Sequence, residues 1–255
     1  MKKDRSTFWA EGIFNPVYDY VTGDLRELIG VIRDINDKKQ KEIEILEGTI
    51  QKENLLREIH HRVKNNFAIL VSLINMQKDQ SVNPDLLEAL TNLQLRIRTM
   101  ALVHEMIYRS ENLQSIPFSD YLKSIATMVA AAHRNVHAPL NLSLEEMSID
   151  LDTAIPLGLI VNEILSNTYK HAFVKSDYKG TIHIELKRDT THYVINLMIQ
   201  DDGCGFPDGF SYEKSETMGL HIINLLVKQI EGTLSIINSK GVTIIIRFHK
   251  SILKP

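Results

Sequence analysis

The chain has 255 residues, of which 44% are hydrophobic and 24% are charged. This length and composition suffice for two modest domains and exclude long disordered stretches. With 29 basic and 32 acidic residues the net charge is −3, so nothing in the charge points to a nucleic acid or an anionic membrane as partner.

The cysteine content and the hydropathy pattern bear on the compartment. The single cysteine, Cys204, excludes an intramolecular disulfide framework and is typical of a reducing environment. No apolar run approaches the ~20 residues that a membrane helix needs, and the charged start lacks a signal-peptide core. We therefore expect a cytoplasmic chain with no direct membrane contact.

Residues 1–36 are predicted to form two strands joined by a turn at Thr22-Gly23-Asp24. Two strands cannot bury a core of their own, so they need neighbouring elements or another surface. This segment resembles the last hairpin of a PAS sensor domain, whose end often reads like Gly30 to Ile35 here. The resemblance implies that most of the sensor domain is absent and that the chain is a piece of a longer protein.

Residues 37–113 are predicted to form two long amphipathic helices joined by the segment Lys78 to Asp85. Such a helical hairpin buries its seam best by pairing with a second copy into a four-helix bundle, so we expect a homodimer. Docking of the seam on the C-terminal domain is the alternative. The expected seam comprises Leu56, Ile59, Val63, Asn66, Leu70, Leu73 and Gln77 on the first helix and Leu86, Leu90, Leu93, Ile97, Met100, His104 and Ile107 on the second.

Residues 114–255 have a mixed pattern. Clustered strands with helices covering one face predict an α+β sandwich. Helices are expected at 118–133, 153–173 and 220–230, and strands at 140–144, 181–187, 193–200, 233–238 and 242–249.

The first chemical motif is the segment Glu58 to Asn66 on the first helix. His61 lies opposite the predicted seam, where an exposed ring nitrogen can attack a phosphate. Lys64 and Asn65 follow three and four residues later on the same face. For the pair His60-His61 alone a solvated polar patch is the better interpretation. A metal site is disfavoured because adjacent helix residues point about 100° apart.

The second motif is the segment Asn162 to Ala172. Its residues Glu163, Asn167, Lys170 and His171 are spaced to share one flank of a helix. A carboxylate and an amide oxygen suit Mg²⁺, and a lysine can neutralise phosphate oxygens, so the flank is a candidate site for a magnesium-bound polyphosphate. A simple polar helix face is the alternative.

The third motif follows an apolar strand and contains Asp201, Gly203 and Gly205. An aspartate at a strand end beside glycines lets the backbone approach a flat ligand, and its carboxylate can accept a hydrogen bond from an exocyclic amine such as that of adenine. A turn with an acidic tip is the alternative. The loop lacks the acidic twelfth residue of an EF-hand and the glycine spacing of a dinucleotide fingerprint.

The fourth motif is the junction Thr217, Gly219 and Leu220, where a loop runs directly into an apolar helix. Free N–H groups at a helix start can hold phosphate. The junction is weak evidence when taken alone, because many helices follow a glycine.

The order of the four motifs resembles a histidine kinase of the branch marked by the His-Arg-x-Lys-Asn box, over about residues 40 to 250. The segments Arg96 to Glu105 and Ile155 to Glu163 match that branch as well. The resemblance implies a Bergerat-type ATP-binding domain of the GHKL superfamily. It assigns His61 as phosphoacceptor, Asn167 to Mg²⁺, Asp201 to adenine, and Gly203, Gly205 and Gly219 to the nucleotide loops.

The implied function is autophosphorylation of His61 with Mg²⁺ and ATP, followed by transfer to an aspartate of a response-regulator receiver domain. Arg62 follows the histidine where most histidine kinases have an acid, which leaves Glu58 or Glu163 as the candidate base. Two alternatives stay open. One is a GHKL-type ATPase that changes conformation without a phosphohistidine, and the other is a non-catalytic dimeric scaffold.

Overall fold

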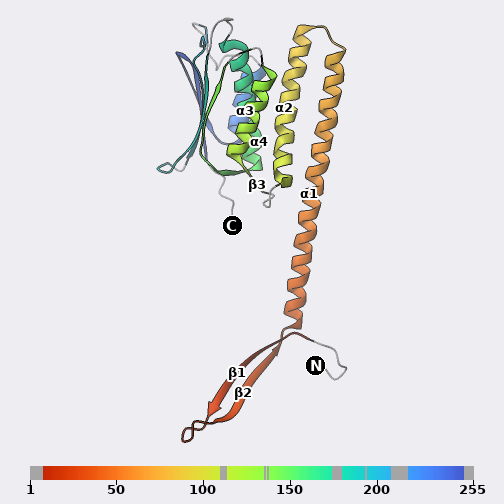
Figure 1. Ribbon diagram of the computed structural model, residues 1–255, viewed down its shortest axis with the longest axis vertical. Helices are drawn as coiled ribbons and strands as arrows, with labels where there is room; N and C mark the ends of the chain where they lie inside the picture. The colour runs from red at the N-terminus through yellow and green to blue at the C-terminus, as the bar shows by residue number, and fades with distance from the viewer. Residues whose placement is uncertain are drawn as a thin grey trace. The chain divides into compact units, whose positions relative to one another are not determined.

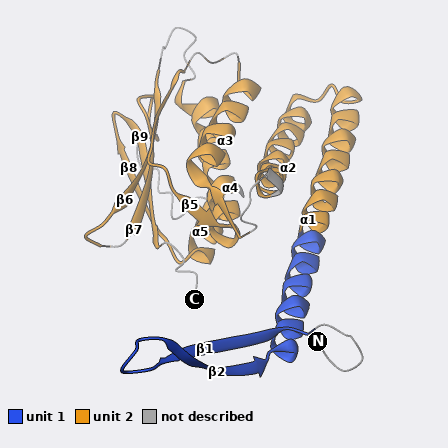
Figure 2. Cartoon of the chain, turned by 60° about the horizontal axis from the view of Figure 1, so that its bottom comes forward, with its two compact units in different colours: residues 1–56 blue, residues 57–255 orange. Residues whose placement is uncertain are grey.

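The computed structural model describes residues 8–109, 114–134, 136, 138–173, 180–192, 194–207 and 218–249. The chain divides into two compact units, residues 1–56 and residues 57–255 (Figure 2). The boundary between them lies within the first long helix. The expected division at 1–36, 37–113 and 114–255 stays a prediction.

The first unit contains an antiparallel hairpin of β1 (Ala10–Tyr18) and β2 (Leu25–Asp34), in which Ala10 pairs with Asp34. The carboxylate of Asp19 stabilises the turn by accepting hydrogen bonds from two backbone N–H groups, and these bonds lower its pKa. Large apolar side chains on both strands are exposed, as expected for two strands without a core. The first part of α1 (Asn36–Asp79) also belongs to this unit.

In the second unit, residues 57–79 of α1 and all of α2 (Pro84–Arg109) form the predicted helical hairpin, which we call the hairpin (Figure 1). Pro84 is the first residue of α2, as expected from its fixed φ. The side chain of Asn83 caps this helix, because its Oδ1 accepts the N–H groups of Asp85 at 2.9 Å and Leu86 at 3.3 Å.

The face of α1 that is covered in the hairpin differs in part from the predicted seam. Val63 of the seam is half-buried as expected, but Ile74, which is buried, and Phe67 and Val71, which are half-buried, lie outside the predicted seam. Residues of the predicted seam remain exposed, among them Leu73 with 52% of its surface accessible. The physical reason is that α1 carries two adjacent apolar stripes, and two packed helices cover only one of them.

The opposite side of α2 packs on α4, which is the docking alternative weighed above. Leu95, Thr99, Val103 and Ile107 of α2 are buried. The hydroxyl of Tyr121 donates a hydrogen bond of 3.0 Å to the backbone carbonyl of Thr99. The hairpin is therefore joined to the following domain along the length of α2.

A five-stranded sheet forms the centre of the C-terminal part, with strand order β4-β6-β7-β9-β8. Strand β4 is parallel to β6, and the other neighbours are antiparallel. The strands are β4 (Leu140–Leu144), β6 (Ile182–Asp189), β7 (Val194–Asp201), β8 (Thr233–Ser239) and β9 (Gly241–His249).

Three helices cover one face of the sheet: α3 (Phe118–Ala132), α4 (Leu151–Asn167) and α5 (Met218–Gln229) (Figure 1). Alternate residues of the central strands are buried beneath them, which confirms the predicted sandwich. The short strands β3 (Ser115–Pro117) and β5 (Ser148–Asp150) pair with each other and were not expected, because three residues carry no readable alternation. We call β3 to β9 with α3, α4 and α5 the sheet domain.

The end of α4 departs from the expected continuous helix. After Asn167 the backbone widens into one π-helical turn over Thr168–Ala172. Such turns change the direction of the side chains that follow and are frequent at functional sites. None of the described helices is long and apolar enough to cross a membrane.

Candidate nucleotide-binding site

A cavity of about 460 Å³ opens between the end of α4, the loop after β7, the start of α5 and strand β9. This volume is in the range of small-molecule sites. Six residues predicted from the sequence line the cavity: Asn167, His171, Asp201, Gly205, Gly219 and Leu220. Most of the remaining wall is apolar and includes Ile164, Ile223 and Ile244.

Asp201 lies at the end of β7 and is buried, with 5% of its surface exposed. Its Oδ1 accepts the N–H of Gly203 at 2.9 Å and that of Val242 at 3.3 Å. Burial raises the pKa of this carboxyl, and the two backbone hydrogen bonds oppose the rise. A buried carboxylate that backbone N–H groups hold in place at a cavity wall is a suitable hydrogen-bond acceptor for an amine of a ligand.

The loop after Asp201 needs its glycines because it approaches the end of α4 closely. The N–H of Cys204 donates to the carbonyl of Ala172 at 3.0 Å, and a Cβ at Gly203 would lie 2.5 Å from Ala172. Gly205 has φ of +72°, a conformation that favours glycine. Gly203 is thus needed for packing, and Gly205 lines the cavity itself.

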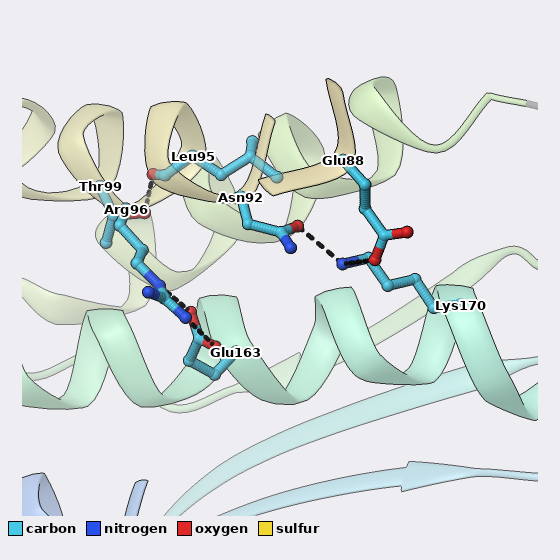
Figure 3. A network of polar contacts seen from close by, with 7 residues as sticks. All are labelled: Glu88, Asn92, Leu95, Arg96, Thr99, Glu163 and Lys170. Atoms are coloured by element: carbon cyan, nitrogen blue, oxygen red, sulfur yellow. Dashed lines mark hydrogen bonds and ion pairs between the residues drawn. The ribbon is translucent and has the colours of Figure 1, made fainter. Parts of the chain in front are cut away.

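Glu163 and Lys170 do not line the cavity and are instead paired with α2 (Figure 3). Both carboxylate oxygens of Glu163 accept hydrogen bonds from Arg96, at 2.6 and 2.8 Å. The ammonium group of Lys170 lies 2.8 Å from Glu88 Oε1 and 2.7 Å from Asn92 Oδ1. The polar flank predicted for this helix is therefore divided between the cavity and α2.

Glu163 nevertheless lies close to Gly219, which lines the cavity. A Cβ placed on Gly219 would be 3.3 Å from Glu163 Oε2 and 3.4 Å from Asn167 Nδ2. The start of α5 thus meets the predicted magnesium ligands at one point. Thr217, also predicted to bind nucleotide, lies outside the described residues.

These residues fit a nucleotide with Mg²⁺. The buried carboxylate of Asp201 suits an exocyclic amine, and the isoleucine side chains of the wall suit a flat base. The amide of Asn167 offers a hard oxygen ligand. Within the described ranges, no group of three or more His, Cys, Asp or Glu side chains is arranged to hold a metal ion.

His61 is exposed on α1, as predicted from its position. Its Nδ1 is 3.3 Å from Asn65 Nδ2, so the side chain four residues later does reach the ring. Lys64 turns instead toward Glu105 of α2, at 3.6 Å. Arg62 and Glu58 form an exposed ion pair at 2.7 Å, so the candidate base Glu58 is engaged by Arg62.

His60 has a different environment from its neighbour. Its Nδ1 is 2.9 Å from Nδ1 of His104 on α2, and the two ring centroids are 5.1 Å apart. Burial lowers the pKa of both imidazoles, and their proximity lowers that of His104 further. His60 therefore contributes to the hairpin contact, whereas His61 faces outward.

The polar residues of α2 were missed as parts of the site. Arg96 appears in the segment that resembles the family, but its sequence position does not reveal its partner. Glu88 and Asn92 carry no motif. The available signal was that Glu88, Asn92 and Arg96 follow one another at intervals of four residues, which places all three on one flank.

Two family profiles match the chain. Residues 58–133 match the family described as histidine kinase, and residues 152–252 match the histidine kinase-, DNA gyrase B-, and HSP90-like ATPase family. The chain belongs to the histidine kinase family. The first match covers the hairpin and continues through α3, and the second covers the sheet domain from α4 to β9.

Several relatives and solved structures agree with this membership. Sensor histidine kinase PdtaS of Mycobacterium tuberculosis is 30% identical over 222 residues, covering 85% of this chain and 43% of that protein. Blue-light-activated histidine kinase 2 of Erythrobacter litoralis is 23% identical over 249 residues, covering 96% and 69%. The chain thus spans less than half the length of PdtaS.

The fold has a solved counterpart. The histidine kinase domain of the Erythrobacter litoralis EL346 blue-light activated histidine kinase superposes with a TM-score of 0.59 at 24% identity. The match covers 77% of this chain and 93% of that domain. It supports the hairpin followed by an ATPase-type sheet domain.

Proposed function

We propose that this chain is the kinase core of a sensor histidine kinase, which phosphorylates itself on His61 with ATP. The observation that carries the proposal is the cavity of the sheet domain, which is lined by the buried Asp201, by the half-buried Asn167 and by the start of α5. An exposed histidine on the adjoining hairpin supplies an acceptor that a simple ATPase does not need.

In this proposal Asp201 binds the adenine amine, and Asn167 holds Mg²⁺ together with the phosphates. Lys170, His171, Gly203, Gly205, Thr217, Gly219 and Leu220 complete the proposed nucleotide contacts. Mg²⁺ would supply charge neutralisation on the phosphate oxygens. The apolar wall of the cavity excludes water from the base, which strengthens the hydrogen bond to Asp201.

The chemical step joins a ring nitrogen of His61 to the γ-phosphorus of ATP, while the bond from that phosphorus to the bridging oxygen breaks and ADP leaves. The attacking nitrogen must be unprotonated. Asn65 Nδ2 lies 3.3 Å from Nδ1 of His61. An amide N–H that donates to Nδ1 leaves the proton of the neutral ring on Nε2, so attack through Nε2 needs a base that takes this proton. Lys64 and Glu163 are proposed to assist, the first by charge and the second as base.

The partners follow from this chemistry. The phosphoryl group would pass from His61 to an aspartate of a response-regulator receiver domain. The exposed stripe of Ile59, Leu70, Leu73 and Met76 on α1 supports a homodimer through a four-helix bundle. We further propose that β1 and β2 end a PAS-like sensor domain and that the protein acts in the cytoplasm.

The proposal is tested by incubating the protein with Mg²⁺ and γ-labelled ATP. We expect acid-labile label on the wild-type chain, and none on His61→Ala. The matched control is His60→Ala, which changes the neighbouring histidine and should keep its label. Label that survives in His61→Ala but is lost in His60→Ala contradicts the assignment. Release of phosphate without any phosphoprotein favours the GHKL ATPase instead.

A further inference from the structure

One flank of α2 carries three polar residues that all contact the sheet domain. Glu88, Asn92 and Arg96 are spaced by four, so they form a stripe along the helix. Figure 3 shows the stripe facing Glu163 and Lys170 across the helix pair. We call this set of contacts the α2 clasp.

The clasp holds two nucleotide-site candidates that do not line the cavity, Glu163 and Lys170. Glu163 is only 7% exposed in its side chain, and Arg96 opposite it is 22% exposed, so this two-point ion pair is partly shielded from water. The Lys170 side chain is 18% exposed, whereas its partner Glu88 is 60% exposed. Asn167, between them in sequence, lines the cavity. The charged groups best suited to phosphate and Mg²⁺ are therefore occupied by α2.

The position of α2 matters for the reaction. In Figures 1 and 2, α2 lies between residues 57–79 of α1 and the helices of the sheet domain. His61 is on α1 and is not among the residues that line the cavity. The clasped arrangement thus separates the proposed acceptor from the proposed donor within one chain.

We propose that Glu88 and Arg96 are positioning residues that set the nucleotide affinity of the cavity, because they hold Lys170 and Glu163 away from magnesium nucleotide. This inference rests on the proposed function of the cavity. Nucleotide and α2 compete for the same two charged groups. By linkage, nucleotide binding loosens the clasp to the same extent that the clasp weakens nucleotide binding.

If nucleotide and α2 compete in this way, weakening the clasp tightens the binding of magnesium nucleotide to the cavity. The apparent dissociation constant is the intrinsic constant divided by the fraction of molecules in the competent state. The ion pair between Arg96 and Glu163 exists only in the clasped state. Arg96→Gln removes this pair, so it destabilises the clasped state relative to the nucleotide-competent one. Glu88→Gln acts in the same direction through Lys170, but less strongly because Glu88 is exposed.

The test is a calorimetric titration of the whole chain with ADP and Mg²⁺. We expect the dissociation constant to fall about 10-fold in Arg96→Gln and about 3-fold in Glu88→Gln, the ratio following from the shielding of the two pairs. The matched controls are Arg98→Gln and Asp85→Asn, which change exposed charges on the same helix and should leave the constant unchanged. Adenosine, which lacks phosphates, should bind all five proteins equally.

The outcomes separate this inference from the function on which it rests. If the wild-type chain does not bind Mg²⁺ with ADP, the nucleotide site itself is wrong. If it binds but Glu88→Gln and Arg96→Gln bind no more tightly, the clasp does not compete and the inference is overturned. Weaker binding by Glu88→Gln with an unchanged melting temperature would show that α2 supports the site rather than opposing it.

Discussion

The hairpin and the sheet domain differ in how they bury their apolar residues. In the sheet domain the buried faces of the strands and of α3, α4 and α5 meet in one continuous core. In the hairpin, α1 buries one of its two apolar stripes and leaves Leu70, Leu73 and Met76 exposed. The sheet domain is thus complete within one chain, whereas the hairpin presents a surface suited to a partner.

This difference follows from geometry. A sheet covered by three helices encloses its inner face, because each helix contributes a buried stripe to the same layer. Two antiparallel helices form a flat layer with two faces that need covering, and α2 packs one of its faces against α4. We therefore expect the two regions to respond differently to the same kind of substitution.

The largest effect on stability is expected from truncating one leucine to alanine in each of the two regions. Leu157→Ala removes a fully buried side chain of α4 and should lower the free energy of unfolding by about 2–5 kcal/mol. Leu73→Ala removes a half-exposed one and should change it by less than about 0.5 kcal/mol in dilute protein. Urea denaturation followed by circular dichroism measures both. Equal losses for the two leucines would contradict the contrast.

A smaller effect is expected on association. Leu73→Asp places a charge in the exposed stripe of α1 and should weaken the homodimer by at least about 10-fold, since burying an unpaired charge costs well over 1.4 kcal/mol. Analytical ultracentrifugation over a concentration series measures this constant. The control is Leu225→Asp, which introduces the same charge at an exposed leucine of α5. Equal association by all three proteins would exclude this stripe as the interface.

The smallest effect is a pH dependence confined to the hairpin. His60 and His104 have pKa values lowered by burial, so the unfolded chain binds more protons than the folded one just below the ordinary histidine pKa. Stability is therefore present above about pH 6.5 and is lost as the pH falls. The centroid of the Phe67 ring lies 5.8 Å from that of His104.

His104→Gln removes one of the two titrating imidazoles and should reduce the loss of thermal stability between pH 7.5 and pH 5.5. Differential scanning calorimetry at the two pH values measures the loss. His221→Gln in the sheet domain is the matched control, because His221 is exposed on α5 and its change should leave the wild-type loss intact. An undiminished loss in His104→Gln would assign the pH dependence to other groups.

Local sequence signals predicted most of the fold. Hydrophobic periodicity located the long helices and the five strands of the sheet, and Pro84 located the start of α2. Two short strands and the π-helical turn after Asn167 were missed. Neither three paired residues nor a widened turn leaves a periodic signal, since both depend on tertiary contacts.

The candidate site was predicted in part. Residues whose role depends on local backbone, such as Asp201 at a strand end and Gly205 in a tight loop, do line the cavity. Glu163 and Lys170 share a sequence motif with Asn167, but their observed partners come from a helix more than sixty residues earlier. No local pattern reveals such partners.

The sequence by itself determined the family, the order of the motifs and the exposed position of His61, because these depend on residue types and on helical spacing. Only the tertiary structure decided which apolar stripe of α1 is covered and that α2 holds Glu163 and Lys170. Both depend on which surfaces meet. A helix with two apolar stripes, or a flank with several charges, is compatible with more than one partner until the chain packs.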